Sequence, residues 1–199
     1  MNELLKLTQV LYHGTTSENN QYLTLKDINK IDPGYGDELS DFGQGFYLTS
    51  FFQQALSYAR MKANRNNKFG KICRPIIIKY ELDTEELQRN CNGKILSETN
   101  EKWAEFIYNN RVKQDTECIS GFHNRDKIYD YIYGRLADGK IAAIIDEYCK
   151  NKEINTNKLL KEILPYFPNN NDQCSLHTKN AIGYLKYIEI IYDTSYKKR

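Results

Sequence analysis

The sequence predicts an α+β fold in which short strands and helices alternate. Three observations indicate this class. Residues 75–82 form an isoleucine-rich run typical of a buried strand, residues 51–64 carry apolar side chains at helical spacing, and no segment repeats elsewhere in the chain. A length of 199 residues, with 40% apolar and 27% charged side chains, suits a single globular domain spanning residues 1–199.

The first third of the chain predicts two strands, a loop and a helix. Residues 9–13 have strand character, and the proline and glycines within residues 32–37 indicate a turn that opens a loop running to Gly45. Residues 46–49 predict the next strand because their aromatic side chains favour extended structure. The helical spacing within residues 51–64 predicts an amphipathic helix entered directly after that strand.

The middle of the chain continues this alternation. A polar, basic stretch at residues 64–71 predicts a loop before the strand at residues 75–82. A helix is expected over residues 98–110, where apolar side chains form a stripe, and a strand over residues 128–133. Residues 140–149 then have the pattern of a further helix.

The last third predicts one helix and two strands. Residues 156–164 form a helical pattern that ends before Pro165. Strand character returns at residues 173–177 and 184–192, which gives at least five strands in all. Residues 94–125 have the weakest pattern, and we expect a helical insertion there that covers a site or docks a partner.

The composition of the chain limits the classes of protein to which it can belong. A net charge of +2, from 28 basic and 26 acidic side chains, does not by itself indicate a nucleic-acid partner. Five cysteines without a C-x-x-C pair favour a reducing cytoplasm over a disulfide scaffold, and a secreted effector without a cleaved signal stays open. No apolar run is long enough to predict a membrane span. His123 and His177 lack the spacing of zinc ligands, so we expect no metal site.

The stretch D-F-G-Q-G-F-Y-L-T at residues 41–49 is the strongest functional motif, together with Y-H-G-T at residues 12–15. Gly43 and Gly45 let the backbone approach a ligand closely, because neither carries a side chain. The strand that follows them begins with two aromatic rings. These features predict a ligand site with an aromatic platform.

His13 is expected at the end of the first strand, with the N–H and C=O of Gly14 open to a ligand. The two ring nitrogens of a histidine suit a hydrogen bond to a ribose hydroxyl. The G-x-G elements at residues 34–36 and 43–45 lack the third glycine and the following helix of a dinucleotide fingerprint. That class of nucleotide site is therefore not indicated.

Three segments taken together, residues 11–15, 43–49 and 172–178, resemble the ADP-ribosyltransferase superfamily. The resemblance is to the branch that includes diphtheria toxin and the poly-ADP-ribose polymerases, whose members carry a His, a Tyr and a Glu on three strands. The chain is most similar to a bacterial family marked by D-F-G-x-G-F-Y-L-T and a later D-x-x-x-G-x-x-A-D, here residues 130–138. The resemblance covers residues 9–192 and implies two small, mostly antiparallel sheets that form an NAD cleft and are flanked by helices.

The resemblance also implies roles for single residues. His13 matches the histidine that hydrogen-bonds a ribose of NAD, and Gly14 matches the residue whose backbone holds the nicotinamide carboxamide. Tyr47 matches the tyrosine that lines the nicotinamide pocket, and Tyr58 falls where the polymerases place a second stacking aromatic ring. NAD is the implied co-substrate, without a metal. The residues expected to contact it are His13, Gly14, Thr15, Gly43, Gly45, Phe46, Tyr47 and Tyr58.

The third position departs from the family pattern, because the expected Glu falls on Gln173. A neutral amide can bond the 2′-hydroxyl of the nicotinamide ribose, but it cannot deprotonate a nucleophile or offset positive charge on the ribose. The implied catalytic set is His13, Tyr47 and Gln173. Asp138 would supply a carboxylate from a neighbouring loop or cap a helix, and both roles stay open.

The resemblance implies an NAD-dependent mono-ADP-ribosyltransferase, of the bacterial toxin or effector kind, that modifies a protein or nucleic acid and releases nicotinamide. Two alternatives stay open: an NAD glycohydrolase, and a catalytically inactive module that binds NAD or ADP-ribose. Support for a nucleic-acid acceptor is a basic cluster within residues 62–74, which a solvated loop explains equally well. A toxin would also have a neutralising antitoxin protein as its partner.

Overall fold

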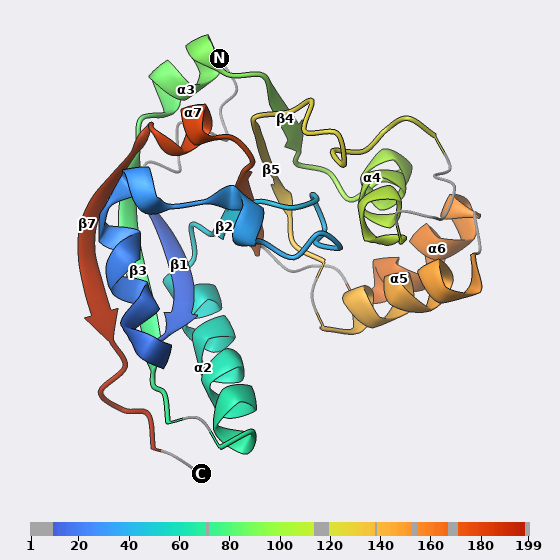
Figure 1. Ribbon diagram of the computed structural model, residues 1–199. Helices are drawn as coiled ribbons and strands as arrows, with labels where there is room; N and C mark the ends of the chain where they lie inside the picture. The colour runs from blue at the N-terminus through green and yellow to red at the C-terminus, as the bar shows by residue number, and fades with distance from the viewer. Residues whose placement is uncertain are drawn as a thin grey trace. The chain divides into compact units, whose positions relative to one another are not determined.

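The computed structural model of the chain describes residues 10–70, 72–113, 120–137, 139–152, 155–166 and 171–197 (Figure 1). It has an α+β fold, as the sequence predicted, with two small, mostly antiparallel sheets and accompanying helices, as the resemblance implied. The chain forms two compact units. Unit 1 consists of Met1–Asp32, Tyr47–Cys91 and Lys179–Arg199, and unit 2 consists of Pro33–Phe46 and Asn92–Thr178.

Unit 1 is built on a three-stranded sheet with the order β1-β3-β7, in which both outer strands run antiparallel to the central β3. Helix α2 packs against β1 and β3, as Figure 1 shows. The elements of this unit are β1 (Val10–Thr16), η1 (Glu18–Lys26), η2 (Ile28–Lys30), α2 (Phe52–Lys68), β3 (Pro75–Leu82), α3 (Thr84–Asn90), α7 (Lys179–Ile182) and β7 (Leu185–Tyr192).

Small residues allow α2 to approach β1 closely. Ala55, Ala59 and Ala63 recur every fourth residue and form the buried stripe of the helix. On the strand, Gly14 faces this stripe, and a Cβ atom built on it would lie 2.3 Å from the carbonyl oxygen of Ala55. Glycine at position 14 is therefore required by the packing of the helix on the sheet.

Unit 2 contains the second sheet, with the order β2-β6-β5-β4. Strand β5 is antiparallel to β6 and parallel to β4. The division between the two units runs through β2 (Phe46–Leu48), directly after Phe46. The other elements are η3 (Pro33–Tyr35), β4 (Gly93–Leu96), α4 (Glu101–Arg111), β5 (Tyr131–Arg135), α5 (Gly139–Asn151), α6 (Thr156–Ile163), η4 (Leu164–Tyr166) and β6 (Asp172–Leu176).

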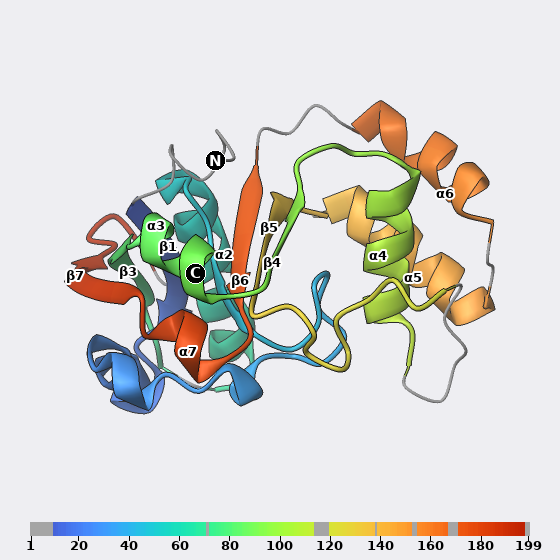
Figure 2. The ribbon, with the colours of Figure 1, turned by 90° about the horizontal axis from the view of Figure 1, so that it is seen from above.

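Helices α4, α5 and α6 pack against one another, and Figure 2 shows them grouped together. Helix α4 supplies the largest buried side chain, Trp103, which is fully buried and donates its indole N–H to the carbonyl of Arg135 at 3.1 Å. Phe106 of the same helix is also fully buried and makes edge contacts with Phe42 and Phe122. The loop that precedes β2 is thus anchored in the core of unit 2 by an aromatic contact.

Several predicted elements are confirmed, and four boundaries are corrected, one of them the start of α4 at Glu101, three residues later than predicted. Strand β3 has the predicted bounds. Strand β1 extends to Thr16, so His13 lies within the strand and not at its end. Helix α2 extends to Lys68, because small and polar side chains continue its pattern, so the predicted loop at residues 64–71 is wrong over its first five residues. Strand β5 begins at Tyr131, three residues later than predicted.

The sequence analysis did not predict the short elements α3, β4 and α7 or the 3₁₀ helices η1, η2 and η3. Within residues 94–125, where a helical insertion was expected, the first residues belong to β4 and α4 is the helix, while residues 114–119 lie outside the described part of the chain. Asp138 also lies outside it. In the described part of the chain, no helix is long and apolar enough to cross a membrane.

Candidate functional site

His13 is held in one tautomer by a hydrogen bond within unit 1. Its Nδ1 lies 2.7 Å from the carbonyl oxygen of Tyr47. A carbonyl can only accept, so Nδ1 carries the hydrogen and Nε2 of the neutral ring keeps a lone pair. Burial lowers the pKa of His13 from 6.5 to about 4. The positive charge of Lys62 also lowers this pKa, and the hydrogen bond to Tyr47 raises it by a smaller amount. At neutral pH the ring is therefore uncharged, with Nε2 as an acceptor.

The main chain of Gly14 faces the edge of the sheet. Strand β1 is an outer strand, and the N–H and C=O of Tyr12 point away from β3, because both bond the main chain of Thr49 at 2.8 and 3.0 Å. In an antiparallel strand, residues two apart present these groups to the same side. The N–H and C=O of Gly14 consequently point to the same edge as those of Tyr12. Gly14 therefore presents one hydrogen-bond donor and one acceptor at that edge of the sheet.

Of the other predicted residues of unit 1, Tyr47 and Tyr58 lie on the elements expected, whereas Thr15 lies within β1 and not after it. Tyr47 is half-buried in β2, and its carbonyl receives the bond from His13. Thr15 follows Gly14 in β1 and pairs with Ile76 of β3. Tyr58 lies on α2 with 51% of its surface exposed, so its ring is accessible in unit 1. A hydrogen bond thus joins His13 to Tyr47 within one unit, and Gly14 follows His13 in the chain, whereas Tyr58 makes no bond to any of them among the described residues.

In unit 2, one face of β6 holds the glycine-rich loop. His177 donates its Nδ1 hydrogen to the carbonyl of Gln44 at 2.9 Å and accepts from the hydroxyl of Ser175, which lies 2.8 Å from Nε2. The imidazole is packed so closely that a Cβ atom on Gly45 would lie 2.7 Å from its Nδ1. Gly43 has a φ of +84°, a left-handed conformation that favours glycine. Both glycines are therefore explained by the shape of this loop.

Gln173 lies on the same face of β6 and is 95% buried. Its amide nitrogen donates to Oδ2 of Asp41 at 2.8 Å. The same carboxylate accepts from Nη1 of Arg111 at 2.7 Å and from the main-chain N–H of Ala137 at 3.1 Å. Burial raises the pKa of Asp41, and the guanidinium of Arg111 opposes that shift. Asp172, the preceding residue of the strand, points to the opposite face and accepts from the hydroxyl of Tyr133.

Sequence reasoning missed Asp41, Arg111 and His177 as members of a cluster. Asp41 stood in the recognised motif, but its partners lie 70 and 132 positions away along the chain. The weak indication was the alternation of polar side chains at positions 173, 175 and 177, which marks a polar face on an otherwise apolar strand.

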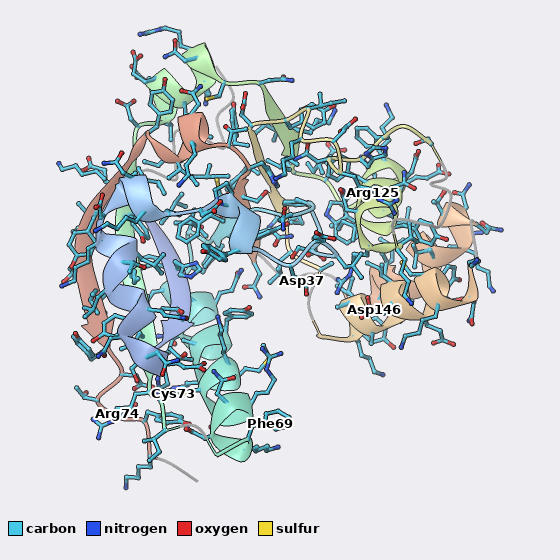
Figure 3. All side chains as sticks on the ribbon, in the orientation of Figure 1. Asp37, Phe69, Cys73, Arg74, Arg125 and Asp146 are labelled. Carbon is cyan, nitrogen blue, oxygen red and sulfur yellow. The ribbon has the colours of Figure 1, made fainter. Side chains whose placement is uncertain are left out.

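A small cavity lies beside the loop in unit 2. It has a volume of about 50 Å³ and is lined by Gln44, Asn110, Asn124 and Arg125 among others, with Arg125 labelled in Figure 3. Pockets for drug-sized ligands occupy roughly 300–1,000 Å³, so this cavity suits water or a small ion and not a nucleotide. Among the described residues, no group of three or more His, Cys, Asp or Glu side chains could hold a metal ion.

Comparison with known proteins places the chain in a family. Residues 9–187 match the model of a family described as "Protein of unknown function (DUF3990)". The chain belongs to this family. No curated protein and no solved structure matches this DUF3990 protein significantly. The matched region runs from the residue before β1 into β7, so it includes every candidate residue from His13 to His177.

Proposed function

We propose that this DUF3990 protein is an NAD-dependent mono-ADP-ribosyltransferase that transfers ADP-ribose to a macromolecule and releases nicotinamide. The observation that carries the proposal is the pair of main-chain groups of Gly14 at the open edge of β1. A carboxamide has one acceptor and two donors, so it can accept from the N–H and donate to the C=O of one residue. Nicotinamide carries such a carboxamide.

His13 supports the same ligand. Its neutral ring offers Nε2 as an acceptor beside Gly14, because Nδ1 is committed to the carbonyl of Tyr47. A ribose hydroxyl is a donor that fits this acceptor. The Tyr47 and Tyr58 side chains supply aromatic faces, and a cationic nicotinamide ring gains about 1 kcal/mol from such a face when it is partly desolvated.

In the proposed reaction, the bond between the nicotinamide nitrogen and C1′ of the ribose breaks, and its electron pair leaves with nicotinamide. A nucleophile of the target forms the new bond to C1′ and releases its proton to water. His13 and Gln173 orient the riboses, and Tyr47 holds the leaving group. No described residue among these is an ionised base, so positioning and exclusion of water supply most of the rate.

A second candidate is a module that binds NAD or ADP-ribose without consuming it. The observation in its favour is Gln173, a neutral side chain whose amide nitrogen donates to Asp41. Such a side chain cannot stabilise positive charge on the ribose. An NAD glycohydrolase, in which water is the acceptor, is the third outcome that the experiment below separates.

The test is nicotinamide release from NAD by the purified protein, measured by chromatography with and without cell lysate. We expect release that depends on lysate and is abolished by His13→Ala and by Tyr47→Ala. His123→Ala is the matched control, because this half-buried histidine lies in unit 2 and has no proposed contact with NAD. Tyr47→Ala leaves the main-chain carbonyl that binds His13, so it tests the ring alone.

Each outcome of this experiment supports a different candidate function. Release without lysate identifies a glycohydrolase, and NAD binding without release identifies the binding module. Turnover that survives both substitutions contradicts the proposal altogether. If the protein is a toxin with a neutralising partner, its expression will slow bacterial growth, and His13→Ala will restore growth while His123→Ala will not.

A further inference from the structure

We infer that Asp41 is a positioning residue that fixes the amide of Gln173 in one orientation, so that position 173 presents a neutral hydrogen-bond acceptor to its ligand. The ligand class is a hydroxyl donor, which under the proposed function is a ribose of NAD. The ligand half of this inference therefore rests on the proposed function. The positioning half concerns unit 2 alone and can be tested without any ligand.

The orientation of the amide follows from the chemistry of its partner. Asp41 Oδ2 lies 2.8 Å from Nε2 of Gln173 and also accepts from the main-chain N–H of Ala137 at 3.1 Å. An oxygen that accepts from a backbone N–H must face a donor at Gln173 and not a second acceptor. The NH₂ end of Gln173 is thus turned toward Asp41. The carbonyl end, Oε1, has no hydrogen bond to any described residue.

The carboxylate is itself immobilised. Its other oxygen accepts from Nη1 of Arg111 at 2.7 Å, and the side chain of Asp41 is only 7% exposed. Asp146 of α5, labelled in Figure 3, lies 3.1 Å from Nε of Arg111, but Nε makes no hydrogen bond, and this half-exposed acid adds little to the anchor. Three donors from α4, β6 and the segment after β5 converge on one aspartate. Because three hydrogen bonds fix the carboxylate of Asp41, it restricts the orientation of the Gln173 amide more than a mobile surface carboxylate would.

The same contact explains why position 173 carries glutamine where the resembling transferases carry glutamate. A glutamate there would place a second carboxylate at hydrogen-bond distance from Asp41, in a site where Gln173 is 5% exposed. Two such carboxylates cannot both ionise without a large cost, so they would share one proton. Arg111 already pairs with Asp41, so a single guanidinium would face two buried carboxylates.

The first experiment measures thermal unfolding of the full chain and three variants across pH. We expect Gln173→Glu to lower the melting temperature by about 10 °C at about pH 8 and by less than half of that at about pH 5, where the pair keeps its proton. Gln173→Met, of similar length and without charge, should lose the same amount at both pH values. Adding Asp41→Asn to Gln173→Glu should remove the pH-dependent part of the loss.

The second experiment measures NAD binding by calorimetry. Asp41→Asn should weaken binding about tenfold, because the freed amide no longer holds its acceptor in place. Asp146→Asn is the control: it removes the other acid beside Arg111, touches no atom of Gln173 and should leave the affinity unchanged.

The results separate two kinds of failure. If Gln173→Glu loses stability equally at both pH values, the contact with Asp41 is refuted whatever the protein does with NAD. If that pH dependence is present but the unmodified chain does not bind NAD, the proposed function fails and the ligand half of the inference fails with it. Equal effects of Asp41→Asn and Asp146→Asn on NAD affinity would also overturn the positioning role.

Discussion

Acidification will destabilise the protein through His177. Burial lowers the pKa of this imidazole from 6.5 to about 4. The positive charge of Lys127 also lowers the pKa, and the hydrogen bond to Gln44 raises it by a smaller amount. The unfolded chain therefore binds a proton near pH 6.5, and the folded protein does not until about pH 4. Unfolding free energy falls as the pH is lowered through this window. The lowering of 2.5 in pKa corresponds to about 3 kcal/mol, lost in full below the folded-state pKa.

The assay is urea unfolding at a series of pH values for the unmodified chain and for His177→Asn. Asparagine does not titrate, and its amide nitrogen can still donate to the carbonyl of Gln44. The variant will be less stable at every pH because the ring is lost, but the difference between the two proteins will shrink as the pH falls toward 4. His13 titrates in both proteins, so its contribution cancels. A stability difference that stays constant from pH 7 to pH 4 would refute the assignment of His177 as buried and neutral.

Three further substitutions test the packing described above, each by denaturant unfolding. Gly14→Ala should lower the free energy of unfolding by about 3 kcal/mol, because its Cβ would lie 2.3 Å from the carbonyl oxygen of Ala55, a backbone atom that cannot move aside. An unchanged denaturation midpoint would contradict the close approach of α2. Gly45→Ala should cost about 1–3 kcal/mol, because the new Cβ would lie 2.7 Å from the ring of His177, and the cost should fall in a His177→Asn background. Trp103→Ala should cost about 3–5 kcal/mol, since the ring is fully buried; a smaller loss would mean that α4 is not anchored there.

The long apolar elements were predictable because their own sequence decides their conformation. Strand β3 and helices α4 and α6 each combine strong periodicity with a clear end, and their positions follow the predictions closely. Short elements are harder to predict from the sequence. Strand β4 has four residues, and α3 has seven, too few for a periodic pattern. The indication that could have found α3 is Asp83 followed by Glu86, since the Asp83 side chain accepts from the N–H of Glu86 as a helix cap.

The site was predictable in its residues and not in its contacts. His13 and Tyr47 stood out in short motifs, and the hydrogen bond between them joins neighbouring segments of unit 1. The sequence interpretation considered only the main-chain groups of Gly14 and gave no packing reason for a glycine there, which the structure finds in the backbone of α2. The bond between Asp41 and Gln173 spans 132 positions, and only the folded chain brings such residues together.

The place of β7 in the first sheet has a consequence for synthesis. Its partner β3 ends at Leu82 and β7 begins at Leu185, so 102 residues are made between them. Until β7 has been synthesised, one edge of β3 has no partner strand, and the nascent chain exposes a row of unpaired main-chain N–H and C=O groups. Unit 1 therefore completes its sheet only once β7 has been made, and a product that stops short of residue 185 should depend on chaperones or aggregate.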